Sequence, residues 1–95
     1  MRFDWDPEKA AENAAKHGIS FDQAIKAFDD PDALFIGDPE HSDGEIREKL
    51  IGATDDAGVV LVVFTERQGD VFRIICAREA TKREKQFYAK NEAAD

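Results

Sequence analysis

The sequence predicts an α+β protein with two N-terminal helices, a four-stranded, mainly antiparallel sheet and a C-terminal helix. Apolar residues recur with helical spacing up to about residue 29. From residue 33 they fall in short extended runs separated by turn sequences, and near residue 81 a capping motif begins a helix again. We expect the helices of such an ααββββα order to cover one face of the sheet. The length of 95 residues predicts a single domain spanning 1–95.

The first helix is predicted over residues 7–17. Asp6 can cap it, Pro7 suits its first position, Glu8 complements the positive end of the helix dipole, and Gly18 suits a left-handed exit. The second helix is expected over residues 21–29. The segment Ser20-Phe21-Asp22-Gln23 has capping-box spacing, and Asp30-Pro31 ends the helix.

Four strands are predicted next, over residues 33–37, 46–51, 59–65 and 71–77. The third run is almost continuously apolar, which is typical of a central strand covered on both faces. Asp55-Asp56-Ala57-Gly58 and Arg67-Gln68-Gly69-Asp70 have the length and glycine content of hairpin connections, so the last three strands should form an antiparallel meander. Thr81-Lys82-Arg83-Glu84 then repeats the capping-box pattern and begins a helix that extends to about residue 91.

The net charge of −8 taken alone argues against binding to nucleic acid or to an anionic membrane. The charge is, however, unevenly distributed: residues 1–60 carry 6 basic and 15 acidic side chains, whereas residues 61–95 carry 7 basic and 6 acidic ones. A basic face on the second half therefore remains open.

The single cysteine, Cys76, fits a reducing compartment, and no segment has the apolar length of a membrane span. We therefore expect a cytoplasmic protein.

A basic cluster lies within seventeen residues of the second half and comprises Arg67, Arg73, Arg78, Lys82 and Arg83. Arginine binds phosphate through a planar, two-pronged guanidinium and stabilises negative charge that develops during phosphoryl chemistry. The alternative is that these are solvated charges paired with Glu66, Glu79 and Glu84. Spacing does not decide between the two, because Arg73 and Arg78 would face opposite sides of a regular strand.

The polar segment 38–45 contains His41 among several carboxylates. It matches no spaced calcium-binding pattern and has one histidine, so we expect a loop and no metal site. His41 can act as a general acid or base near neutral pH. The sequence also has no glycine-rich phosphate loop, no zinc-spaced Cys/His set and no serine-hydrolase motif, and we expect no cofactor.

Several blocks together resemble the BrnT toxin family, over nearly the whole chain and in order. They are Phe3-Asp4-Trp5-Asp6-Pro7-Glu8-Lys9-Ala10, Lys16-His17-Gly18-Ile19-Ser20-Phe21, Asp38-Pro39-Glu40-His41-Ser42, Thr65-Glu66-Arg67, and Arg73 through Glu84 followed by Tyr88. The resemblance implies a RelE-like ribonuclease of a type II toxin–antitoxin pair. It also implies inactivation by a BrnA-like antitoxin, through which this protein would be brought to operator DNA only indirectly.

The resemblance points to Arg67, Arg73, Arg78 and His41 as site residues, together with Arg47. The sequence departs from the family pattern at Cys76, where we expect serine, and at Phe64, where we expect histidine or tyrosine.

Two functions follow as hypotheses. In the first, the protein cleaves RNA without a metal ion: the ribose 2′-OH attacks the adjacent phosphate, Glu66 or His41 is the base, and Arg67, Arg73 and Arg78 stabilise the phosphate charge. The RNA backbone would be bound by Arg47, Lys49, Lys82 and Arg83. In the second, the protein is an inactive binding module or co-repressor that only holds its antitoxin. The acidity and Phe64 motivate this alternative.

Overall fold

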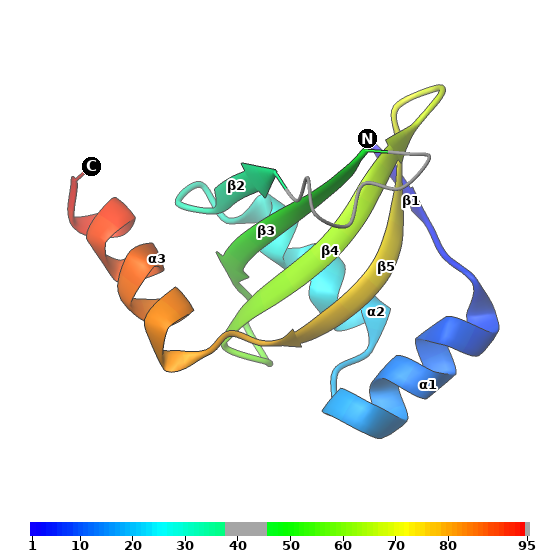
Figure 1. Cartoon of the computed structure of the whole chain (residues 1–95), viewed down its shortest axis with the longest axis horizontal. Coiled ribbons are helices and arrows are strands. Elements are labelled where there is room, and N and C mark those ends of the chain that lie inside the picture. The colour runs from blue at the N-terminus through cyan, green and yellow to red at the C-terminus, as the bar shows by residue number, and fades with distance from the viewer. Residues whose placement is uncertain (38–45, 95) are drawn as a thin grey trace.

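The structure is a computed structural model that describes residues 1–37 and 46–94 (Figure 1). Its order along the chain is a short strand, two N-terminal helical segments, four further strands and a last helix. The elements are β1 (Arg2–Asp4), α1 (Pro7–His17), α2 (Phe21–Ala24), the 3-10 helix η1 (Ile25–Asp29), β2 (Leu34–Gly37), β3 (Arg47–Ala53), β4 (Val59–Arg67), β5 (Val71–Glu79) and α3 (Lys82–Ala94).

The local signals read from the sequence lie at the ends of these elements. The Asp6 carboxylate accepts a hydrogen bond from the backbone N–H of Glu8, and Gly18 leaves α1 with a φ of 71°. Ser20 and Gln23 form the expected capping box at α2. The predicted second helix therefore exists, but after a single α-helical turn it continues as η1.

The five strands form one sheet in the order β1-β5-β4-β3-β2. Strands β2 to β5 pair antiparallel, as expected for the meander, whereas β1 pairs parallel with β5 through Phe3 opposite Phe72. The prediction of four mainly antiparallel strands was thus incomplete, because the sheet is five-stranded and mixed. Strand β1 has three residues, which is too short for alternation to reveal it in the sequence.

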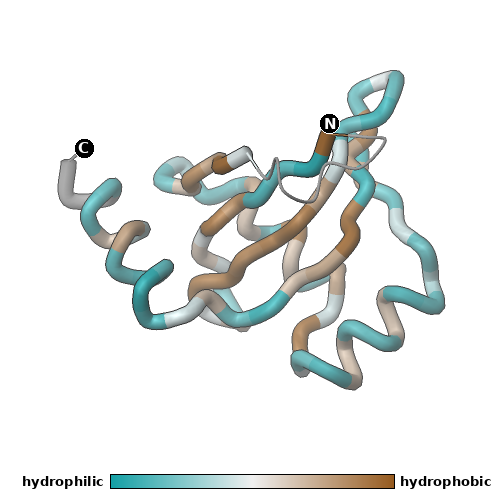
Figure 2. Tube along the Cα trace, viewed as in Figure 1, coloured by the Kyte–Doolittle hydropathy of each residue, from teal (hydrophilic) through white to brown (hydrophobic). Residues whose placement is uncertain are grey.

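Two apolar clusters cover the two faces of the sheet. The larger one joins β3, β4 and β5 to α2 and η1, and it contains Phe21, Ala24, Leu50, Val62 and Phe64, each at most 2 % exposed. Trp5 and Phe28 pack against it. Figure 1 shows α2 behind the sheet, and Figure 2 shows the hydrophobic residues concentrated in the strands, with α1 and α3 largely hydrophilic.

The smaller cluster lies on the opposite face and contains Ile51, Leu61, Ala80 and Tyr88. Since Ile51 and Leu61 alternate with Leu50 and Val62 along their strands, α3 packs on the face that α2 and η1 leave open. The expectation that all helices cover one face was therefore wrong. Tyr88 is the physical reason, because it is the buried aromatic side chain of an otherwise polar helix and it packs beside Ile51 and Leu61.

None of the helices in residues 1–37 and 46–94 is long and apolar enough to cross a lipid bilayer.

Candidate functional site

An irregularity in β5 decides which way its arginines face. Val63 pairs with Cys76 and Phe64 pairs with Ile74, so Ile75 is an extra residue between two regular stretches of the β4–β5 ladder. Arg73 and Arg78 are five positions apart, and without the bulge they would lie on opposite faces. With it, both lie on the face opposite the α2 side. We call this surface the open face.

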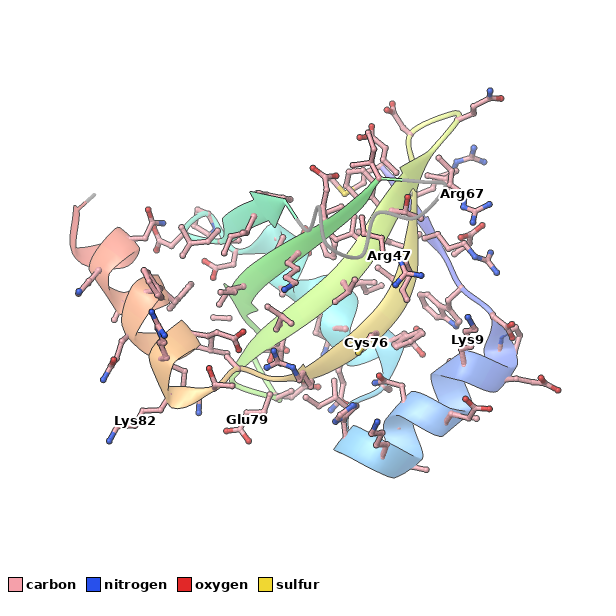
Figure 3. All side chains as sticks on the ribbon, viewed as in Figure 1. Lys9, Arg47, Arg67, Cys76, Glu79 and Lys82 are labelled. Atoms are coloured by element: carbon pink, nitrogen blue, oxygen red, sulfur yellow. The ribbon has the colours of Figure 1, made fainter. Side chains whose placement is uncertain are left out.

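Three arginines meet at one end of the open face. Arg47 of β3 and Arg73 of β5 are both paired with Thr65, which lies between them on β4, and Arg67 follows two residues after Thr65. Lys9 of α1 joins these side chains around a hollow of about 100 Å³, which is also lined by Asp6, Ile74 and Ile75. We call it the arginine hollow. Figure 3 shows Arg47, Arg67 and Lys9 on this part of the molecule, which lies far from Lys82.

Within residues 1–37 and 46–94, two acidic groups at the arginine hollow, Asp4 and Asp6, already interact with the protein. Arg73 forms an ion pair of 3.3 Å with Asp4 of β1, and the Asp6 carboxylate caps α1. The parallel pairing of β1 with β5 aligns Asp4 with Arg73, so the short strand positions this guanidinium. Among the described residues, four cationic side chains and one carboxylate line the hollow, which makes it a candidate site for an anion such as phosphate.

Arg78 lies farther along β5 and is bound to the last helix. Its guanidinium donates two hydrogen bonds to the carboxylate of Glu84, at 2.8 and 3.0 Å. These bonds raise the pKa of Arg78 and hold the pKa of Glu84 below its ordinary value. The same carboxylate accepts the backbone N–H of Thr81 and completes the predicted capping box at α3. Arg78 therefore joins β5 to the start of α3.

A second hollow, of about 240 Å³, extends from Arg47 toward Arg78 across the open face. We call it the sheet hollow; it is lined by Arg47, Lys49, Leu61, Val63, Ile75, Cys76 and Arg78. Lys49, a predicted RNA-binding residue, therefore lies on the same face as the arginines. Lys82 and Arg83 lie apart from both hollows at the start of α3, where the Arg83 guanidinium is 6.0 Å from the centre of the Phe87 ring.

The two candidate bases differ in position. Glu66 is exposed and lies opposite Phe72, a residue of the α2 side, so the strand alternation separates it from Arg47 and Arg73. It nevertheless lines an open depression of about 570 Å³ together with Arg67 and Asp4. His41 lies outside the described residues.

The two departures from the family pattern occupy different environments. Phe64 is fully buried on the α2 side, where its ring lies 5.0 Å from that of Phe28 and 5.1 Å from that of Phe72. It is a core residue and faces away from the arginines. Cys76 is a half-buried free thiol on the open face.

Across residues 1–37 and 46–94, no group of three or more His, Cys, Asp or Glu side chains could hold a metal ion.

Lys9 is the site residue that reasoning from residue types did not select. Its spacing in an alanine-rich helix indicates only an exposed position, and the side chain is indeed exposed. The sequence feature that could have pointed to Lys9 is its place in the first block that resembles the BrnT family, directly before Ala10. The three arginines of the hollow are at least 38 positions away from Lys9 in the sequence, so the fold was needed to bring them together.

Fold and site together define a small α+β protein with a cationic hollow, a candidate anion site, on the open face of its sheet. Residues 5–84 match the model of a family described as the ribonuclease toxin, BrnT, of type II toxin–antitoxin systems. Because the match covers most of the chain, the protein belongs to the BrnT toxin family, as the sequence resemblance indicated.

A solved structure has the same fold. It is the crystal structure, at 1.1 Å resolution, of the ribonuclease toxin BrnT of Brucella abortus, which aligns with a TM-score of 0.59 and 24% identity. The alignment covers 86% of this chain and 99% of that one. Among curated proteins, none matches this sequence.

Proposed function

We propose that this protein cleaves RNA by a metal-independent transesterification at the arginine hollow. The 2′-oxygen of the ribose forms a bond to the adjacent phosphorus while the bond from phosphorus to the 5′-oxygen breaks. The products are a 2′,3′-cyclic phosphate and a free 5′-OH. A base removes the proton of the 2′-OH, and the departing 5′-oxygen takes up a proton.

The convergence of Arg47, Arg67 and Arg73 around one hollow is the observation that carries this proposal. Negative charge accumulates on the phosphate oxygens as the 2′-oxygen attacks, and prearranged guanidinium donors stabilise that charge without reorganisation. The ion pair with Asp4 holds Arg73 in place at a distance of 3.3 Å. Lys9 adds a fourth cation from a different element.

Glu66 and His41 remain the two candidates for the base. Glu66 shares an open depression with Arg67, so an RNA that reaches around the end of β4 would bring its 2′-OH near both side chains. His41 is proposed from the sequence alone, because a histidine side chain can accept and release a proton near neutral pH. Substitution of each residue, Glu66→Gln and His41→Asn, distinguishes them through the acid limb of the pH–rate profile.

The sheet hollow is the proposed path of the RNA beyond the reacting phosphate. Arg47 and Lys49 lie along it, and Arg78 lies at its far end. Because the Arg78 guanidinium is already bound to Glu84, we assign it a part in RNA binding only where phosphate competes with that carboxylate. Lys82 and Arg83 would contact RNA that continues past the start of α3.

The proposed protein partner is a BrnA-like antitoxin that blocks cleavage, with operator DNA bound only through the antitoxin. A type II system pairs the toxin with a protein inhibitor, which gives the partner class.

The test is cleavage of a labelled RNA in excess EDTA and low salt, for the wild type, Arg73→Ala and Lys90→Ala. Loss of one such donor should lower the rate about 100- to 1,000-fold. Lys90 is an exposed residue of α3, so Lys90→Ala should cleave at the wild-type rate. Equal rates for Arg73→Ala and the wild type would disprove the assignment. Cleavage that stops in EDTA would disprove the metal-independent step.

A second candidate function is an inactive module that only binds its antitoxin. It is favoured by β2, an edge strand whose Phe35 and Ile36 side chains are 59 and 44 % exposed. An apolar edge strand is a ready surface for strand addition by a partner. In this case the folded wild type would leave RNA intact while still forming an interface of at least about 1,000 Å² with the antitoxin.

A further inference from the structure

We infer that α1 forms a second arm of the RNA-binding surface, which leads the RNA backbone away from the arginine hollow past Lys9 and Lys16. This inference rests on the proposed function and extends it to an element to which the sequence assigned no functional role. The arm is a hollow of about 210 Å³ between α1 and β5, which we call the α1 hollow.

The three hollows adjoin one another, because one residue lines all of them. Ile75, the extra residue of the β5 bulge, lines the arginine hollow, the sheet hollow and the α1 hollow. Lys9 is shared by the arginine hollow and the α1 hollow. A strand of RNA whose phosphate lies among the arginines therefore has two exits, one across the open face and one along α1.

The spacing of the lysines on α1 suits a nucleic acid backbone. Lys9 and Lys16 are seven residues apart, so they lie on the same side of the helix after two turns, separated by about 10 Å at 1.5 Å per residue. That length corresponds to about three nucleotides at the rise of 3.4 Å of a stacked strand. Both side chains are exposed, and His17 lines the hollow at its far end.

Charge favours RNA at this surface although the molecule as a whole is acidic. Of the residues described in the structure, five Lys and Arg side chains and two carboxylates, those of Asp6 and Glu12, line the α1 hollow and the arginine hollow together. Asp6 caps α1, so Glu12 is the lining carboxylate that opposes an approaching phosphate. Beyond Lys9, which the arm shares with the arginine hollow, the arm therefore contains Lys16, which should attract RNA, and Glu12, which should repel it.

The experiment measures binding of 2′-O-methyl RNA, which cannot be cleaved because its 2′-oxygen has no proton to lose. Fluorescence anisotropy is followed for a long probe of about 12 nucleotides, a typical site length for single-stranded RNA, and for a short probe of about three. Lys16→Gln is expected to weaken binding of the long probe about threefold to tenfold and to make the salt dependence shallower by about 0.7 in log–log slope. Glu12→Gln should strengthen it.

Matched controls carry the same charge changes on other elements. Lys90→Gln on α3 and Asp29→Asn on η1 are both exposed and should leave both probes bound as in the wild type. Circular dichroism and thermal melting establish that each variant is folded.

The outcomes separate this inference from the proposed function. If the wild type binds the long probe and Lys16→Gln binds it as tightly as Lys90→Gln does, the α1 arm is disproved while RNA binding at the arginines stands. An equal loss for the short and long probes would also overturn the arm, because Lys16 would then act at the central site. If the folded wild type binds neither probe, the proposed function and the arm both fail.

Discussion

Asn13 joins α1 to the sheet through its buried side chain. Its amide N–H groups donate to the backbone oxygens of Ile19 and Ala77, at 3.0 and 2.8 Å, and its amide oxygen accepts the N–H of Ala77 at 3.1 Å. Ala77 lies beyond Val71–Arg73, the stretch of β5 that β1 covers. Asn13 therefore takes the place of a neighbouring strand there, and it holds α1 against β5, where Lys9 lies next to the arginines.

The prediction at this scale is that Asn13→Ala lowers the free energy of unfolding by about 2–6 kcal/mol. The substitution leaves a buried N–H and a buried carbonyl of Ala77 without their partner, each at a cost of about 1–3 kcal/mol. Urea unfolding monitored by circular dichroism measures this change in the free energy of unfolding. Asn91→Ala, which removes a single half-buried bond to Asp32, is the control and should cost less than about 1 kcal/mol. Equal losses for the two variants would contradict the role given to Asn13.

Residue types in the sequence identified the cationic site only in part. Arg67 and Arg73 could be selected because arginine suits phosphate, and both line the hollow. The sequence could not show that Arg73 and Arg78 lie on the same face of the sheet. That placement depends on the bulge at Ile75, which a pattern of alternating residues does not reveal. The Arg78–Glu84 pair was foreseen only as one of two alternatives, because whether a side chain binds phosphate or a neighbouring carboxylate depends on three-dimensional distances.

Among the elements, α3 is fixed to the sheet by few interactions. The hydroxyl of Tyr88 donates to Asp30 at 2.6 Å, and the same carboxylate accepts the N–H groups of Ala53 and Asp32. Burial opposes ionisation of Asp30, but these three hydrogen bonds outweigh it and hold its pKa below the ordinary value. Together with the Arg78–Glu84 pair, this network holds α3 on the open face.

We predict that Tyr88→Phe destabilises the protein by about 1.5–3 kcal/mol at neutral pH, the usual loss for a hydrogen bond to a charged group. Because the folded pKa of Asp30 is depressed, its bonds stabilise the protein above the unfolded pKa of about 4, and that stability is lost as the pH falls through the folded value. The difference between Tyr88→Phe and the wild type should therefore shrink below about pH 4. The measurement is thermal melting of both proteins across pH 3–7, about the range in which carboxylates titrate. A stability difference between Tyr88→Phe and the wild type that stayed constant over this range would contradict the role given to the Tyr88–Asp30 hydrogen bond.

The order of elements was predictable, whereas their arrangement in space was less so. Capping residues and hairpin glycines mark the ends of α1, α2, β4 and β5 in the sequence, and the structure has those elements within a few residues of the predicted bounds. Strand β1 and the position of α3 were not predictable, because both depend on contacts between distant residues. Phe3 pairs with Phe72, and Tyr88 packs on Ile51.

At the scale of the whole molecule, the charge of −8 and the cationic hollow act in opposite directions. The hollow offers local cations to a phosphate, whereas the field of the remaining surface repels a polyanion at distances beyond the Debye length of about 10 Å in 0.1 M salt. Binding should therefore depend on close contact, with little long-range attraction.

The corresponding prediction concerns salt. For a non-cleavable single-stranded RNA we expect a log–log slope of about −3 between affinity and salt concentration, from four phosphate contacts at about 0.7 each by Lys9, Arg47, Arg67 and Arg73. Arg73→Gln should reduce the slope by about 0.7. A slope near zero in the wild type would mean that the hollow does not bind phosphate.

The pairing of β1 with β5 also sets the order in which the molecule can be made. Arg2 lies opposite Val71, and Asp4 forms an ion pair with Arg73, so the first strand has no partner until residues 71–73 have been synthesised. The hollow likewise lacks one of its three arginines until Arg73 has been added. A chain still growing on the ribosome therefore contains the parts of the site but not the site itself, and closing the edge of the sheet and completing the cationic hollow are one late event in folding.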